Sequence, residues 1–201
     1  MRTKWLKVIS YGLILFGIAI ILFSLFRIFE QKNSVQESLK VAKAAIVNDS
    51  SIQREEGETL NSPAQYNFKQ GDIIGLLQIP KLERELPIIE GVDGEELKRG
   101  VGHYAGTMLP NQSNQIFLAG HRDTAFRDMG DLERGDLLTI VLSTEAFTYK
   151  IFDMYIVNKY DVSVIRSTSP REILTLSTCY PFTAIGSSEE RYIIEAERVL
   201  E

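Results

Sequence analysis

The longest uninterrupted apolar run in the chain lies near its beginning, at residues 8–26, VISYGLILFGIAIILFSLF, and contains no charged residue. A helix of this length crosses a bilayer core of about 30 Å at about 1.5 Å per residue. The preceding segment, residues 1–7, contains three basic and no acidic side chains, and the positive-inside rule keeps such a flank in the cytoplasm. Because no small-x-small cleavage pattern follows the run, the pattern predicts an uncleaved signal anchor: a single membrane span, with everything after residue 26 on the outer side.

A polar stretch, residues 27–70, separates this run from the rest of the chain. Residues 31–48 place apolar side chains at a loosely helical spacing, which indicates a continuing or separate helix. Residues 49–70 are polar, contain Gly57 and Pro63 and show no sustained period. We therefore expect a stalk and linker between the membrane and a folded domain at residues 71–201.

Residues 71–201 alternate short apolar runs with Gly, Pro, Asn, Asp or Ser. Runs rich in aliphatic, β-branched and aromatic residues with such boundaries are typical of β-strands. They are GDIIGLLQIP, ELPIIEG, NQIFLAG, DLLTIVLS, FTYKIFDMYIVN, ILTLSTC and RYIIEAERVL. Seven or eight such segments predict an all-β barrel or sandwich.

Two local features refine this prediction. In the fifth segment the apolar side chains change phase after Ile151, which predicts a bulge or bend there. The short run GEELKRG, residues 94–100, is the best helical candidate inside the domain.

Charge is distributed unevenly along the chain. The 201 residues contain 22 Lys and Arg against 27 Asp and Glu, for a net charge of -5. Residues 1–70 carry nine basic and six acidic side chains, a net +3, whereas residues 71–201 carry thirteen and twenty-one, a net -8. An acidic domain lacks the basic excess of a nucleic-acid-binding protein, so we expect no nucleic-acid partner.

The candidate chemistry rests on one cysteine, Cys179, and two histidines, His103 and His121, each beside a turn. Taken alone, each residue has an inert interpretation. Cys179 can be a small buried hydrophobic residue, and either histidine can be a hydrogen-bonded core residue. Together, a free thiol on the outer side of a membrane and an imidazole at a strand end are the parts of a Cys-His nucleophilic site. The residues alone leave the choice between the two histidines open.

A guanidinium at Arg191 follows Cys179 at the start of the last apolar segment. If the chain turns back there, Arg191 can stabilise developing negative charge beside the thiol. The alternative is a surface arginine paired with Glu189 or Glu190.

These residues resemble the sortases, the membrane-anchored cysteine transpeptidases of Gram-positive cell surfaces. The likeness rests on TLSTC with an Arg twelve residues after the Cys, a Gly-His pair upstream and the N-terminal anchor; GVGHY, AGHRDT, TLSTCYPF and RYII look most like class D. The resemblance implies an eight-stranded β-barrel with short helices, preceded by a transmembrane helix, and requires no cofactor or metal. It implies Cys179 as nucleophile, His121 as general acid and base, and Arg191 as stabiliser of the oxyanion and substrate.

Three further residues receive lesser roles from the resemblance. Thr178 matches a position that helps to bind substrate, and His103 becomes a secondary candidate near the pocket. Asp123 can orient the imidazole of His121, although an Asp after Gly-His-Arg serves equally well as a turn residue.

The implied reaction is cleavage of an LPxTG-like sorting signal after Thr, followed by transfer of the acyl group from Cys179 to an amine of a cell-wall precursor. The partners are then surface proteins with C-terminal sorting signals, the peptidoglycan precursor and the membrane. Two alternatives stand beside this. One is a non-catalytic, membrane-anchored β-barrel for binding or scaffolding, with Cys179 inert. The other is a zinc site at Cys179 and His121 with His103 or Asp123.

Overall fold

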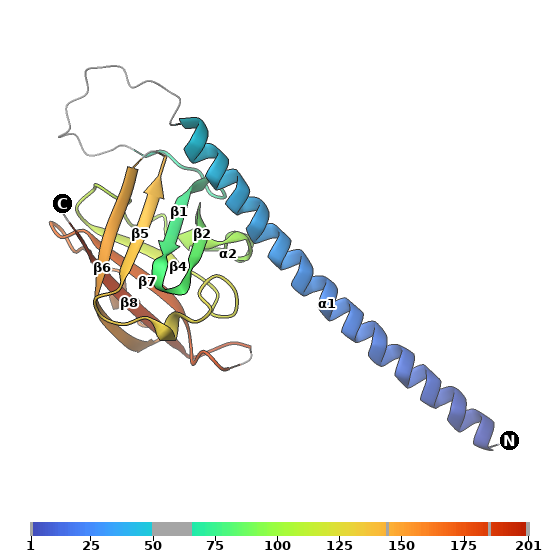
Figure 1. Cartoon of the computed structure of the whole chain (residues 1–201). Coiled ribbons are helices and arrows are strands. Elements are labelled where there is room, and N and C mark those ends of the chain that lie inside the picture. Colours follow the sequence, from blue (N-terminus) through green and yellow to red (C-terminus); the bar gives the residue numbers. More distant parts are fainter. Residues whose placement is uncertain (1, 50–65, 144, 185, 200–201) are drawn as a thin grey trace.

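The structure is a computed structural model that describes residues 2–49, 66–143, 145–184 and 186–199; for residues 2–10, 27–32 and 47–49 it describes the backbone only. The short apolar runs become the strands of a closed barrel, in the order β1-β2-β3-β4-β7-β8-β6-β5 (Figure 1). The strands are β1 (Ile73–Ile79), β2 (Arg84–Glu90), β3 (Val101–His103), β4 (Gln115–Ala119), β5 (Leu137–Leu142), β6 (Glu145–Asn158), β7 (Ile173–Tyr180) and β8 (Glu190–Arg198). The eight-stranded barrel is confirmed.

Among the residues described for the barrel, four short helical segments join the strands. Helix α2 (Gly94–Arg99) confirms the helix expected over residues 94–100. Three 3-10 turns lie at η1 (Pro80–Leu82), η2 (Met129–Asp131) and η3 (Val162–Val164). Strand β3 was not among the segments expected from the sequence, because a run of three residues that follows Gly100 and contains Gly102 carries too little apolar pattern.

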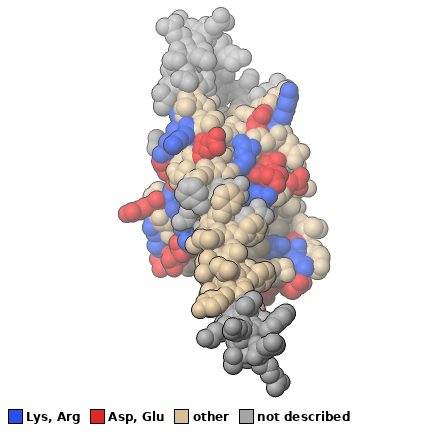
Figure 2. Space-filling view, turned by 90° about the vertical axis from the view of Figure 1, so that its right-hand side faces the viewer, with Lys and Arg blue, Asp and Glu red and all other residues tan. Residues whose placement is uncertain are grey.

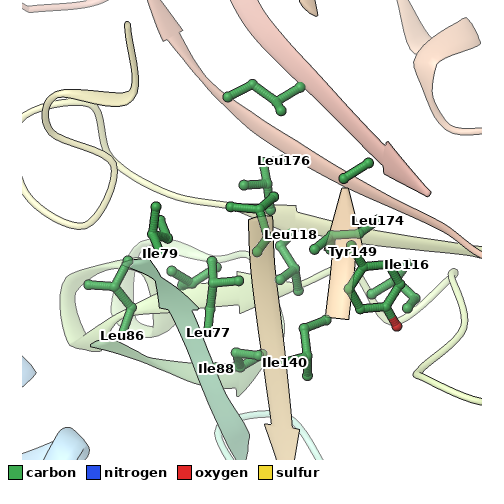
Figure 3. Close-up of a cluster of buried hydrophobic side chains, with 14 of the residues drawn as sticks. Leu77, Ile79, Leu86, Ile88, Ile116, Leu118, Ile140, Tyr149, Leu174 and Leu176 are labelled. Atoms are coloured by element: carbon green, nitrogen blue, oxygen red, sulfur yellow. The ribbon is translucent and has the colours of Figure 1, made fainter. Parts of the chain in front are cut away.

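The interior of the barrel is filled by alternate side chains of its strands, as the period of two along a strand requires (Figure 3). The side chains that meet there include Leu77, Ile79, Leu86, Ile88, Ile116, Leu118, Ile140, Tyr149, Leu174 and Leu176. The hydroxyl of Tyr149 donates a 2.7 Å hydrogen bond to Glu172, which satisfies its polar end. Burial is the main cause that raises the pKa of this phenol, so it stays protonated.

The phase change in β6 is a β-bulge. Pairing between β6 and β8 shifts between Ile151 and Asp153, which leaves Phe152 as the extra residue. Ile151 is buried, whereas Phe152 is exposed, so the bulge lets the apolar side chains change phase without opening the core. The bend expected near Ile151 is confirmed.

Helix α1 (Arg2–Asp49) is one continuous helix, so residues 31–48 continue it rather than forming a separate one (Figure 1). Its last part packs on β1, β2 and α2. Ser38 and Ala42 are buried there, Lys43 pairs with Glu85, and Arg99 donates a hydrogen bond to Ser38 of 3.4 Å.

The side chains of helix α1 between residues 11 and 26 lie clear of the barrel. The large apolar ones are 48 to 67% exposed, and Figure 2 shows an uncharged tan surface where the barrel around it carries both red and blue side chains. Considering only the residues that the structure describes, none of its helices combines the length and apolar character needed to cross a membrane. Residues 8–10 of the expected span have side chains outside the described set.

Residues 50–65 of the expected linker also lie outside the described residues. The last part of that linker packs on the barrel. Tyr66 and Phe68 contact the core, and the Tyr66 hydroxyl donates to the carbonyl of Pro110 at 3.2 Å. Packing of the barrel therefore begins before Gly71.

Candidate active site

The parallel pairing of β4 with β7 brings the ends of these two strands together. Ala119 lies opposite Ser177 in the register, and the amide of Gly120 donates to the carbonyl of Ser177 at 3.1 Å. His121 and Cys179 each follow two residues after this last pair. Parallel strands end at one edge of the sheet, so the imidazole and the thiol are delivered to the same end of the barrel.

The antiparallel pairing of β7 with β8 adds the guanidinium. Cys179 and Arg191 lie directly opposite each other in the register. Directly opposed residues project from the same face of a sheet, with Cβ atoms about 5 Å apart. Leu174 and Leu176 point into the core, so alternation puts Cys179 and Arg191 on the outer face of the barrel.

Cys179 is a half-buried free thiol. Within the part of the chain that the structure describes, neither the thiol of Cys179 nor the imidazole of His121 forms a hydrogen bond. Both groups are therefore available to a substrate. The main chain around them is fixed, because the Phe126 amide donates to the His121 carbonyl at 2.9 Å and closes the turn after β4.

Arg191 is held by main-chain oxygens rather than by carboxylates. One nitrogen, Nη1, donates to the carbonyls of Ser188 and Glu190, each at 3.0 Å. The Glu189 carboxylate pairs with Lys159 at 2.6 Å. Among the described residues Nε and Nη2 of Arg191 have no partner, so these donors are free while Nη1 fixes the side chain. In the described part of the chain no ion pair joins Arg191 to Glu189 or Glu190, so the contacts do not support the alternative of a surface arginine paired with either.

Thr178 has a clear structural function. Its side chain is 4% exposed, and its hydroxyl donates to the carbonyl of Gly120 at 2.8 Å. This bond joins the ends of β7 and β4 one residue before Cys179 and His121. The hydroxyl therefore holds the two candidate catalytic residues in register.

The structure does not bring His103 to this group. His103 is 3% exposed, and its Nδ1 lies 2.7 Å from Glu90 Oε2 while its Nε2 lies 3.0 Å from the carbonyl of Met108. It opposes Leu118 on the other side of β4 from Cys179. Both ring nitrogens have partners within the fold, which favours the reading of a hydrogen-bonded core histidine.

Asp123 is exposed in the turn after His121. Its main-chain carbonyl accepts hydrogen bonds from Nε and Nη2 of Arg127 at 3.0 and 2.6 Å. The Asp123 carboxylate forms no hydrogen bond with His121 or with any other described residue. The contacts favour the turn-residue reading over an orienting partner for the imidazole.

Comparison with known proteins identifies the family of the chain. The family model described as "Sortase domain" matches residues 77–199, which include all three residues gathered at the end of the barrel. The chain belongs to the sortase family. Sortases are cysteine transpeptidases, so this protein is an enzyme of that type.

The similarity extends over nearly the whole chain. Sortase D of Bacillus subtilis is 40% identical over 195 residues, which are 96% of this chain and 98% of that protein. The structure of a Clostridium perfringens Sortase D5 transpeptidase has a TM-score of 0.67 at 24% identity, and the match covers 83% of this chain and 99% of that one. The structure of Sortase E1 from Streptomyces coelicolor, with a tripeptide in its active site, has a TM-score of 0.59 at 32% identity, over 66% and 92% of the two chains. The resemblance to class D is confirmed.

A second apolar cluster lies on the outer face of the sheet in this sortase. Phe117 of β4, Ile193 of β8 and Val164 of η3 are buried together, with Ala119, Tyr155, Val157 and Ile165 packed around them. By alternation Ile193 lies on the same face as Arg191, and Phe117 on the same face as Ala119. These side chains are buried against one another, so the cluster covers part of the outer face of the sheet.

The zinc alternative has no ligand set in the described residues. No group of three or more His, Cys, Asp or Glu side chains lies close enough together there to hold a metal ion.

One residue beside the site, Arg122, was not predicted from the sequence. It is 8% exposed and donates from Nη2 to the carbonyl of Gly186 at 2.7 Å. Nothing in the sequence around Arg122 predicts its burial, because the burial depends on a loop whose contact residue comes 64 residues later.

Proposed function

We propose that this sortase cleaves an LPxTG-like sorting signal after its Thr and joins the released protein to an amine of a cell-wall precursor. One observation supports the proposal most strongly. Cys179 lies opposite Arg191 near the end of β7, and β7 runs parallel to β4, which ends two residues before His121. This arrangement provides a nucleophile, an oxyanion stabiliser and a proton carrier at one end of the barrel.

In the first half-reaction the Cys179 thiolate attacks the Thr carbonyl carbon. The carbonyl oxygen becomes an oxyanion, to which Nε or Nη2 of Arg191 donates, since Nη1 is occupied by main-chain carbonyls. His121 as imidazolium gives its proton to the departing Gly nitrogen while the C–N bond breaks. The product is a thioester between Cys179 and the Thr carbonyl.

In the second half-reaction the acceptor amine attacks the thioester carbon. The amine loses a proton to His121, the C–S bond breaks, and Cys179 leaves as a thiolate. A new amide bond replaces the one that was cleaved, so the reaction needs no external energy source. Water in place of the amine gives slow hydrolysis.

Residues 8–26 anchor the enzyme as a single span in this proposal, with residues 1–7 in the cytoplasm and the barrel outside. The support is the exposure of the apolar side chains from Tyr11 to Phe26 on all sides of helix α1. A helix that is apolar all round needs an apolar surrounding. Both substrates are tethered to the same membrane, so anchoring raises their effective concentration at the site.

The test uses the full chain in detergent with a quenched Leu-Pro-x-Thr-Gly peptide and an amine acceptor. We expect peptide cleavage, a mass increase on Cys179 equal to the acyl fragment, and an amine-linked product, all absent in Cys179→Ala. Equal peptide consumption by Cys179→Ala and the parent, or no reaction in either, would overturn the proposed reaction. Varying each letter of the peptide and the acceptor then defines the preferred signal and amine.

The topology is tested separately. A reporter fused after residue 201 should be protected from protease added to the cytoplasmic face of membrane vesicles, and an N-terminal tag should be digested. Release of the chain from the membrane by alkaline carbonate would contradict the anchor without affecting the proposed chemistry.

A further inference from the structure

Arg122 differs from its charged neighbours in the turn after His121, since Asp123 and Arg127 are exposed whereas Arg122 is 8% exposed. One nitrogen, Nη2, donates to Gly186, and the other, Nη1, is buried without a hydrogen-bond partner among the described residues. The ion pairs formed by the described residues do not include Arg122. A buried cation without a carboxylate and with an unused donor lowers stability, so stability does not explain this side chain.

Its partner lies in the loop between β7 and β8, residues 181–189. That loop follows the strand that carries Cys179 and precedes the strand that carries Arg191. Gly186 has φ +86°, in the left-handed region, so its carbonyl is presented by a turn that favours glycine. The bond from Arg122 thus joins the turn after His121 to the loop between the other two residues of the site.

The same loop holds Arg191. Ser188, two residues after Gly186, accepts the hydrogen bond from Arg191 Nη1, and its hydroxyl donates to the carbonyl of Tyr180. Arg122 and the guanidinium opposite Cys179 therefore bind main-chain carbonyls that lie two residues apart in the same loop.

We propose that Arg122 is a positioning residue, which fixes the β7–β8 loop against the His121 turn and thereby places Arg191 for transition-state stabilisation. This inference rests on the proposed function of Arg191. It follows that loss of the Arg122 contact slows the chemical steps through Arg191, while the barrel and the sorting-signal contacts stay as they are.

Two other arginines provide matched controls because they bind the same turn without reaching the loop. Arg84 donates from Nη1 to the carbonyls of Thr124 and Ala125 at 2.9 and 3.2 Å. Arg127 donates within the turn, to Asp123. If any arginine that steadies the His121 turn supports catalysis, all three should matter equally.

The experiment compares Arg122→Met, Arg84→Met and Arg127→Met in the full chain, each measured for kcat, KM and thermal midpoint. Met keeps an unbranched apolar stem and removes the guanidinium with its donors. For Arg122→Met we expect kcat to fall about 10- to 100-fold, the scale for a misplaced catalytic group, with KM changed less than about threefold. The midpoint should move by less than about 3 °C, because removing the unpartnered donor offsets loss of the Gly186 bond. The two controls should keep kcat within about twofold.

A double-mutant cycle with Arg191→Lys identifies the route of the effect. If Arg122 acts through Arg191, Arg122→Met should cost less than about threefold in the Arg191→Lys background. An undiminished cost there, a kcat within twofold of the parent for Arg122→Met, or an equal loss in Arg84→Met would overturn the proposal. If Arg191→Lys is itself inactive, the comparison of the three Met variants decides alone.

Failure of the proposed function is a different result. In that case the parent shows no Cys179-dependent transfer, and the Met variants have no activity to compare. Failure of the Arg122 inference leaves the parent active and Cys179-dependent.

Discussion

Gly120 is the position where a single methyl group should disturb the site most directly. It lies between the end of β4 and His121, and its carbonyl accepts the hydrogen bond from Thr178. A Cβ atom added there would lie 2.7 Å from Cδ2, 2.9 Å from Cγ and 3.0 Å from Cε2 of Phe126. The Phe126 ring is fully buried in the core, so it cannot swing away.

Gly120→Ala therefore forces either the ring or the end of β4 to move. Overpacking of this kind costs about 1–3 kcal/mol. For a domain of this size we expect a fall in the thermal midpoint on the order of 5 to 10 °C. Movement of the end of β4 also displaces His121, and a displacement near 1 Å lowers kcat by about 100-fold.

Thermal unfolding and peptide transfer on the full chain measure both effects. Gly94→Ala is the matched control, because no atom lies within 4 Å of a Cβ there and Gly94 begins helix α2. It should raise stability by about 0.5–1 kcal/mol and leave kcat unchanged. The double variant Gly120→Ala, Phe126→Leu should recover part of both losses, since the smaller side chain makes room. Parent-like stability and kcat in Gly120→Ala would refute the contact between strand end and ring.

Three further changes test the surroundings of the site. Thr178→Val should cost about 1–3 kcal/mol and lower kcat, because the buried carbonyl of Gly120 loses its donor, whereas Thr178→Ser should retain both when measured by denaturant unfolding and peptide transfer. His103→Ala should cost about 3 kcal/mol, as Glu90 loses its buried partner, yet keep kcat per folded molecule in the same assays; a selective loss of kcat would restore His103 to the site. The hydrogen bond from Lys43 lowers the pKa of Glu85 below its ordinary value of 4.5. This ion pair is half exposed, so it contributes under about 1 kcal/mol to the free energy of unfolding. The contribution is fully present above the ordinary pKa of Glu85 and is lost as the pH falls through the lowered pKa. An NMR titration should show the pKa of Glu85 returning toward 4.5 when Lys43 is replaced by Met, and an unchanged pKa would contradict the contact of helix α1 with β2.

Much of the fold can be read from the sequence because the strands alternate regularly. The apolar phase change after Ile151 predicted the bulge, since an inward-facing set can change phase only where a strand gains a residue. The packing of Tyr66 and Phe68 was missed because a polar segment with no period gives no sign of two aromatic anchors. Strand β3 was missed for a similar reason, as its pairing with β2 is set by the barrel and not by its own three residues.

The site was only partly predictable. The residue types indicated a thiol, an imidazole and a guanidinium, but the choice between His121 and His103 needed the resemblance, because both follow a Gly beside a turn. The register of β4 with β7 gives an independent reason for placing His121 beside Cys179. Strand pairing decides which residues lie together at one end of a sheet, and the sequence alone does not show it. The burial of Arg122 had no counterpart in the sequence, because a distant loop creates it.

The register of β7 ultimately determines what its cysteine can do. Leu174 and Leu176 point into the core, and with a period of two this places Cys179 on the outer face opposite Arg191. A slip of one residue would bury the thiol and expose Thr178, which would also lose its bond to Gly120. Two core leucines therefore oppose such a slip, and they do so without contributing any atom to the chemistry. It follows that replacing Cys179 or Arg191 should leave the barrel intact, whereas weakening the core beneath β7 should reduce activity before the barrel unfolds.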